Sequence, residues 1–132
     1  METPYDDRSG LIWLDGDLVP WRDAKGHVLT HALHYGSSVF EGERAYGGKI
    51  FESRKHSERL IESGKYLDMP LTYSVDDIES AKQQILDTAS AEDLYVRAIA
   101  WRGSGLDMGV ASARNKVHLA IAAWEWGAYY GD

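Results

Sequence analysis

A short segment, THALHYGSSVFEGERAYGG at residues 30–48, concentrates side chains that could do chemistry. Histidines, acidic residues, an arginine and aromatic rings alternate there with glycines. Gly36 and Gly42 remove side chains where a core strand would need them, so neither helical periodicity nor plain strand alternation explains the segment. We infer that some group approaches this backbone closely.

Strand alternation places part of this segment on one face. In SSVFEGERAY that face carries Ser38, Phe40, Gly42, Arg44 and Tyr46. An apolar ring, a gap and a cation suit a small amphipathic acid. A packed strand with a bulge would have the same pattern, and the residues alone slightly favour it.

A second arginine lies in an apolar strand, DLYVRAIAW. Alternation puts Arg97 on one face with Tyr95, Ile99 and Trp101. A buried guanidinium is costly unless it is paired, so Arg97 either meets a local carboxylate or is kept for an incoming anion. The neighbouring hydroxyl of Tyr95 favours a carboxylate site modestly.

Other candidate groups are weaker. His31 and His34 lack the third ligand of a zinc site, so no metal site is expected. The glycine-rich loop at 103–115 has neither dinucleotide nor P-loop spacing. Arg59 lies in a charged helical segment, where its spacing favours a solvated face.

The elements that must position these residues follow from turn and periodicity signals. Asp15-Gly16 and Gly47-Gly48 are tight-turn pairs, each predicting a β-hairpin. Strands are predicted over 38–46, 49–52, 93–103 and 116–126. Helices are predicted after an N-cap at Ser53 and after a capping box at Ser74, ending near 69 and 89. We therefore expect an α+β fold: a small mixed or antiparallel β-sheet with two helices.

Composition narrows the function classes. The chain has 132 residues, 44% of them hydrophobic, which suits one domain with a real core. A net charge of -7 argues against nucleic-acid or anionic-membrane partners. No segment approaches the roughly 18 apolar residues of a membrane span. With no cysteine and no basic, apolar leader, we expect a cytoplasmic protein.

Five motifs together resemble one family. HALHYGSSVFEGERAY, RKHSERLIESGKYL, LYVRAIAWRG, DMGV and WEWGAYYG look like the amino-terminal small domain of branched-chain amino acid aminotransferases. These enzymes have fold type IV, use pyridoxal 5'-phosphate (PLP), and serve branched-chain amino acid biosynthesis. The likeness runs from about residue 11 to 132, in the family's order and spacing.

The resemblance implies roles for single residues. Arg59, in HSERL, matches the arginine that binds the cofactor phosphate, which replaces the solvated-face interpretation. Tyr95 and Arg97 match residues of the substrate pocket, and Arg97 would recognise the second carboxylate of glutamate. Phe40 and Gly42 resemble the apolar wall that receives a branched side chain.

Further roles concern Arg44, the partner subunit and the second domain. Arg44 belongs to the same strand motif as the apolar wall and is counted among the substrate-binding residues. Tyr35 and a loop of Met108, Gly109 and Val110 are similar to groups that reach the neighbouring subunit's site in a homodimer. Tyr129, in WGAYYG, matches an interdomain residue near the substrate. The bare glycines would then admit a bound side chain.

The chain also departs from the family. The Schiff-base lysine and most phosphate contacts lie in the family's large carboxy-terminal domain, and none of the six lysines here stands in a matching motif. We therefore expect no catalytic residue in this chain, a small domain over 1–124, and the start of an interdomain linker over 125–132. We interpret the chain as a fragment that is inactive alone.

Two functional hypotheses remain. In the first, the chain is part of an enzyme that moves an amino group between leucine, isoleucine or valine and 2-oxoglutarate, with glutamate as the reverse donor. In the second, it is a noncatalytic small-acid-binding or dimerisation module. D-amino acid aminotransferases, aminodeoxychorismate lyases and R-selective amine transaminases share the fold, but YVR and FEGERAY favour the branched-chain group.

Overall fold

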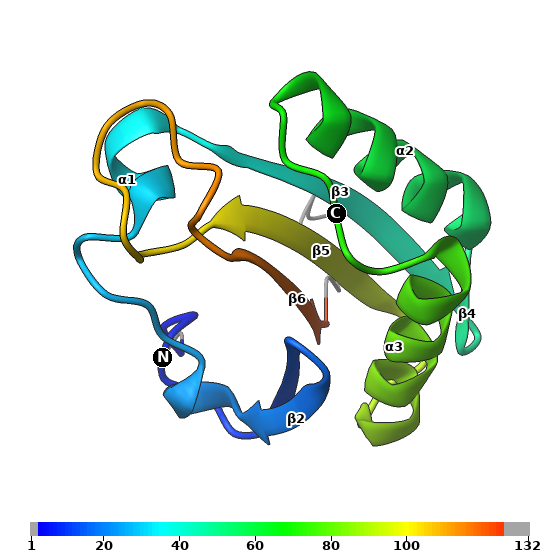
Figure 1. Ribbon diagram of the computed structural model, residues 1–132. Coiled ribbons are helices and arrows are strands. Elements are labelled where there is room, and N and C mark those ends of the chain that lie inside the picture. Colours follow the sequence, from blue (N-terminus) through cyan, green and yellow to red (C-terminus); the bar gives the residue numbers. More distant parts are fainter. Residues whose placement is uncertain (1–2, 126–132) are drawn as a thin grey trace, which may run out of the picture.

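Six antiparallel strands form a single sheet in the computed structural model, which describes residues 3–125. Their order is β2-β1-β6-β5-β3-β4, shown in Figure 1. The strands are β1 Leu11–Leu14, β2 Asp17–Pro20, β3 Ser38–Tyr46, β4 Lys49–Ile50, β5 Leu94–Arg102 and β6 Val117–Trp124. The α+β prediction is confirmed, and the sheet is purely antiparallel.

Both predicted hairpins are present. Asp15 and Gly16 take positive φ values of 50° and 105° between β1 and β2, as a two-residue turn requires. Gly47 and Gly48 do the same between β3 and β4. The fourth strand is shorter than predicted, because it ends at Ile50 rather than residue 52.

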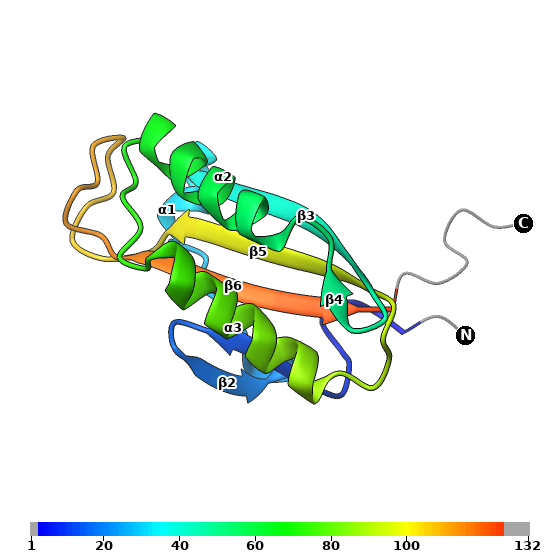
Figure 2. The same cartoon turned by 90° about the vertical axis from the view of Figure 1, so that its right-hand side faces the viewer.

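Two helices cover one face of the sheet, as Figures 1 and 2 show: α2, Ser53–Tyr66, and α3, Val75–Thr88. The capping box of α3 is confirmed, with Ser74 and Asp77 bonding each other's backbone N–H groups. The N-cap predicted at Ser53 is wrong. Glu52 caps α2 in a left-handed conformation, and the hydroxyl of Ser53 bonds Glu79 instead.

The core lies between the sheet and these helices. Leu94, Val96, Ala98 and Ala100 of β5 are buried against residues such as Leu60. Burial of this apolar surface is the main driving force for folding. The alternate residues of β5 are half-buried on the opposite face, as strand alternation predicts.

Two short helices were not predicted: η1, Trp21–Asp23, and α1, His31–Tyr35. Five residues are too few to show helical periodicity in a sequence. Gly36 ends α1 with a φ of 67°, a left-handed conformation that favours glycine. In the described part of the chain, no helix combines the length and the hydropathy needed to cross a membrane.

Candidate functional site

Strand β3 places candidate site residues on both of its faces. Along residues 38–43, the structure described for 3–125 pairs β3 only with β5, so this stretch is an open edge of the sheet. Phe40 and Gly42 lie on the face opposite the helices, whereas Glu41 and Glu43 point into the buried face. The predicted alternation is therefore confirmed.

Arg97 lies among aromatic groups on the open face. Its guanidinium lies 4.2 Å from the centroid of the Phe40 ring, and its Nε and Nη2 donate to the Tyr95 hydroxyl at 3.2 and 2.7 Å. No carboxylate among residues 3–125 lies within ion-pair distance of it. Of the two alternatives left by the sequence, this arrangement favours an arginine kept for an incoming anion.

Gly42 makes room for Tyr95. A Cβ at this position would overlap the Tyr95 hydroxyl and lie 3.1 Å from its Cζ. Gly36, in contrast, meets nothing and is needed for its positive φ. The structure therefore corrects the expectation that both glycines admit a bound side chain.

An apolar cavity of about 470 Å³ opens beside Arg97, on the same face of the sheet. Its walls include Ile12, Leu14, Ile99, Trp101, Ala122 and Trp124. Besides Arg97, Lys25 brings a second cation to its lining. Phe40 and Arg44 do not line it, and the Arg44 guanidinium lies 5.4 Å from the Tyr46 ring centroid.

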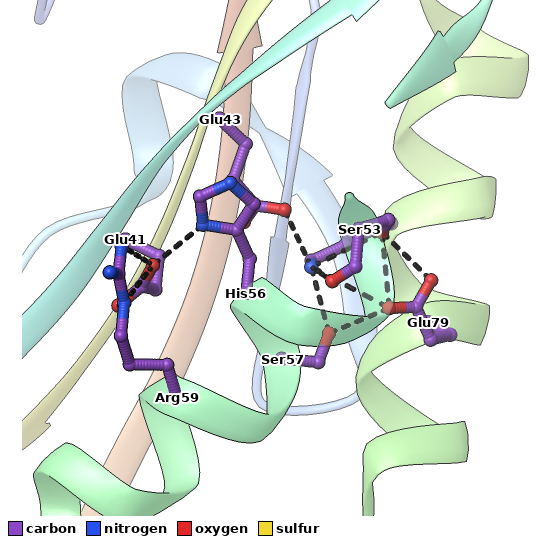
Figure 3. Close-up of polar contacts among 8 residues, drawn as sticks. Glu41, Glu43, Ser53, His56, Ser57, Arg59 and Glu79 are labelled. Carbon is purple, nitrogen blue, oxygen red and sulfur yellow. Dashed lines mark hydrogen bonds and ion pairs between the residues drawn. The ribbon is translucent and has the colours of Figure 1, made fainter. Parts of the chain in front are cut away.

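Arg59 is held from the helix side of β3 by a buried carboxylate, as Figure 3 shows. Its Nε donates to Glu41 Oε2 at 2.9 Å and its Nη2 to Glu41 Oε1 at 2.8 Å. His56 Nδ1 lies 2.7 Å from the same Oε1. Burial alone would raise the pKa of Glu41, but hydrogen bonds from Arg59 and His56 outweigh it and lower that pKa.

A second buried ion pair lies beside the first. Lys82 Nζ donates to Glu43 Oε1 at 2.7 Å and to Ser57 Oγ at 2.8 Å. Ser53 and Ser57 also donate to Glu79, so β3, α2 and α3 share one polar network. Burial raises the pKa of Glu43, although Lys82 pulls it in the other direction.

The residues expected to reach a partner subunit lie together at one end of the sheet, where Figure 1 shows α1 beside the loop that follows β5. Tyr35 donates its hydroxyl to the Met108 carbonyl at 2.8 Å, and buried His31 lies 2.8 Å from the Gly109 carbonyl. Val110 next to them is 76% exposed. The structure therefore brings Tyr35, Met108, Gly109 and Val110 into one exposed group.

Sequence reasoning missed the partners of Arg59 and the whole Lys82 network. A signal existed, because Glu41 and Glu43 fall in the buried phase of their strand and Lys82 falls on the apolar stripe of its helix. Charges at such positions require partners. Tyr129, and residues 126–132 of the predicted linker, lie outside the described residues.

The amino-transferase class IV family matches residues 38–132 of the chain. A curated relative, the branched-chain-amino-acid aminotransferase of Pseudomonas aeruginosa, is 47% identical over 96% of this chain and 42% of its own length. The Escherichia coli enzyme is 39% identical over 94% of this chain and 41% of its own length.

Solved structures agree with the sequence relatives. The E. coli branched-chain amino acid aminotransferase superposes with a TM-score of 0.84 at 36% identity, covering 90% of this chain and 42% of that one. A T.th. enzyme of the same name, complexed with N-(5'-phosphopyridoxyl)-L-glutamate, gives 0.85 at 41% identity over 92% of this chain and 42% of that one. The chain thus spans less than half of these relatives, and it belongs to the class IV aminotransferase family.

Proposed function

We propose that this chain is the small domain of a PLP-dependent branched-chain amino acid aminotransferase, which exchanges an amino group between leucine, isoleucine or valine and 2-oxoglutarate. The relatives that it matches over most of its own length carry that name. The observation that carries the proposal is an arginine without a carboxylate partner in the described chain, placed between an aromatic ring and an apolar cavity.

Arg97 suits a pocket that must accept both kinds of substrate. An apolar wall favours a branched side chain, and a guanidinium that lacks an internal carboxylate partner favours the second carboxylate of glutamate. Tyr95 holds the guanidinium through its hydroxyl, in the space that Gly42 leaves. Phe40, stacked on Arg97, supplies the apolar side.

Arg59 fits a phosphate group. Its side chain is 68% exposed, and Glu41 occupies only one edge of the guanidinium. The opposite edge keeps N–H donors for phosphate oxygens, a geometry in which arginine binds phosphate well. PLP, when bound, withdraws electrons from the amino acid, and the chain's own contribution is to hold its phosphate.

Partner and domain contacts complete the proposal. Tyr35, Met108, Gly109 and Val110 form the surface that would approach a second subunit in a homodimer. Tyr129 would contact substrate near the boundary with a large domain that supplies the cofactor-bearing lysine. A cytoplasmic location stays a prediction.

The test uses the full-length protein, with kinetics for two substrates. Arg97→Met should reduce kcat/KM for glutamate at least tenfold more than for leucine, because only glutamate loses an ion pair, worth about 1.5–3 kcal/mol. Arg22→Met, an exposed arginine paired with Asp7, serves as the control and should change neither. Equal losses for both substrates would show that Arg97 is structural.

A further inference from the structure

We propose that Glu41 is a positioning residue, which fixes the guanidinium of Arg59 in the orientation that receives a phosphate. This role rests on the proposed function, because it assumes that Arg59 binds the phosphate of PLP. It adds to that function a residue on the opposite face of β3 from the substrate pocket.

The geometry leaves one edge of Arg59 for a ligand. A guanidinium carries five N–H donors. Glu41 accepts from Nε and from Nη2, which fixes the guanidinium plane through two nitrogens. Both N–H groups of Nη1 and one of Nη2 then point away from Glu41, along the edge that binds two phosphate oxygens.

The two partners differ in burial in the way that positioning requires. Glu41 is 5% exposed, whereas the Arg59 side chain is 68% exposed. The carboxylate is further restrained by His56, which lies 2.7 Å from Oε1 on the first turn of α2. An arginine without such an anchor would lose rotamer freedom when it binds phosphate, whereas this one has lost much of it beforehand.

A competing effect has the opposite sign. The negative charge of Glu41 partly neutralises Arg59 and repels a phosphate. Water and salt screen that repulsion at an exposed guanidinium, whereas the restraint on the side chain does not depend on salt. We therefore infer that anchoring outweighs repulsion, and that removing Glu41 weakens phosphate binding.

The experiment compares two ligands that differ only by the phosphate. Full-length wild type and Glu41→Gln are titrated with PLP and with pyridoxal, and binding is followed by absorbance. Glutamine keeps the side-chain volume but loses the charge and one acceptor. We expect PLP affinity to fall about three- to tenfold, the effect of freeing one long side chain. Pyridoxal affinity should not change.

Three further variants make the test specific. Arg59→Ala should also lose affinity for PLP alone, and Glu41→Gln should add nothing to it, because both act through one contact. Should the glutamine variant fail to fold, Glu41→Asp replaces it, since it keeps the charge but withdraws the carboxylate by one methylene. Arg54→Ala, an exposed arginine of α2 paired with Asp76, is the matched control and should change neither affinity.

Several outcomes would overturn the role of Glu41. Unchanged PLP affinity would show that Arg59 needs no anchor, and tighter PLP binding would show that Glu41 merely neutralises it. Equal losses for PLP and pyridoxal would indicate a general structural effect. If wild type and Arg59→Ala bind PLP equally, the phosphate site of the proposed function itself is wrong, and that result is distinct from the others.

Discussion

Glu41 and Glu43 are two residues apart on one face of β3, yet their pKa values move in opposite directions. Both are nearly excluded from water, so burial raises both pKa values. Glu41 receives hydrogen bonds from Arg59 and His56 that overcome burial. Glu43 receives one from Lys82, and its Oε2 finds no hydrogen-bond partner among the described residues. The number of donors therefore decides the sign.

This difference gives a prediction at the residue scale. Arg59→Ala should raise the pKa of Glu41, because its main donor is lost while burial remains. A carboxyl group with a lowered pKa stabilises the folded state above its unfolded value, near 4.5, and loses that contribution as the pH falls through its folded pKa. The variant should therefore lose less stability on acidification than wild type does. Carbon-13 NMR titration of the Glu41 carboxyl checks the pKa, and an unchanged value would contradict the assigned cause.

At the scale of elements, β3 is attached to both helices by charge rather than by apolar packing alone. Glu41 pairs with Arg59 of α2, and Glu43 pairs with Lys82 of α3. Because these glutamates alternate with Phe40 and Gly42, the placement of α2 also fixes Arg59 relative to the residues on the other face. One strand thereby relates the phosphate ligand to the substrate pocket.

The Lys82 pair can be tested by stability measurements. Lys82→Met leaves Glu43 as an uncompensated buried charge and should cost about 3–5 kcal/mol of unfolding free energy. Adding Glu43→Leu should recover much of that loss, since two apolar side chains of similar volume can pack where the ion pair was. Urea unfolding of the three proteins measures both steps. A double variant no more stable than the single one would contradict this account.

At the other end of the sheet, His31 should control the loop that follows β5. Its imidazole lies 2.7 Å from Ser37 Oγ and 2.8 Å from the Gly109 carbonyl, so His31→Ala removes the tie between α1 and this loop. We expect a local cost of about 1–3 kcal/mol and faster amide exchange in the loop around Gly109. Hydrogen exchange by mass spectrometry measures it, with exposed His34→Ala as the control. Equal acceleration throughout β5 would indicate global destabilisation instead.

The sequence predicted the elements whose signals are local, and it missed contacts that depend on packing. Gly47-Gly48 and Ser74 mark a turn and a cap within a few residues, and both are confirmed. Glu41 and Arg59 are 18 residues apart, so their pairing depends on how α2 lies across β3. Spacing within the helix gave Arg59 only solvent or charged neighbours. The site roles themselves came from a family resemblance and stay predictions.

At the scale of the whole molecule, the candidate residues form three groups around one sheet. The Arg97 pocket lies on the face opposite the helices, Arg59 lies on the helix side of the open edge of β3, and the exposed group around Tyr35 lies at one end. Each group offers contacts but no reacting amine in a confined position: Lys82 is buried in an ion pair, and the other lysines are exposed. The chain is therefore built to bind and to orient.

The 132-residue chain alone should accordingly show no amino transfer from leucine to 2-oxoglutarate, because covalent catalysis needs a lysine fixed against the cofactor. Lys25 is the most demanding case, since it lines the same cavity as Arg97. It is exposed to water, however, and its long side chain is not confined as a Schiff-base lysine must be. Borohydride reduction in the presence of PLP should leave Lys25 unlabelled, and mixing the chain with a separately made large domain should restore some activity. Turnover by the chain alone that Lys25→Ala abolishes, with host enzyme excluded, would identify a catalytic amine here and overturn this assignment.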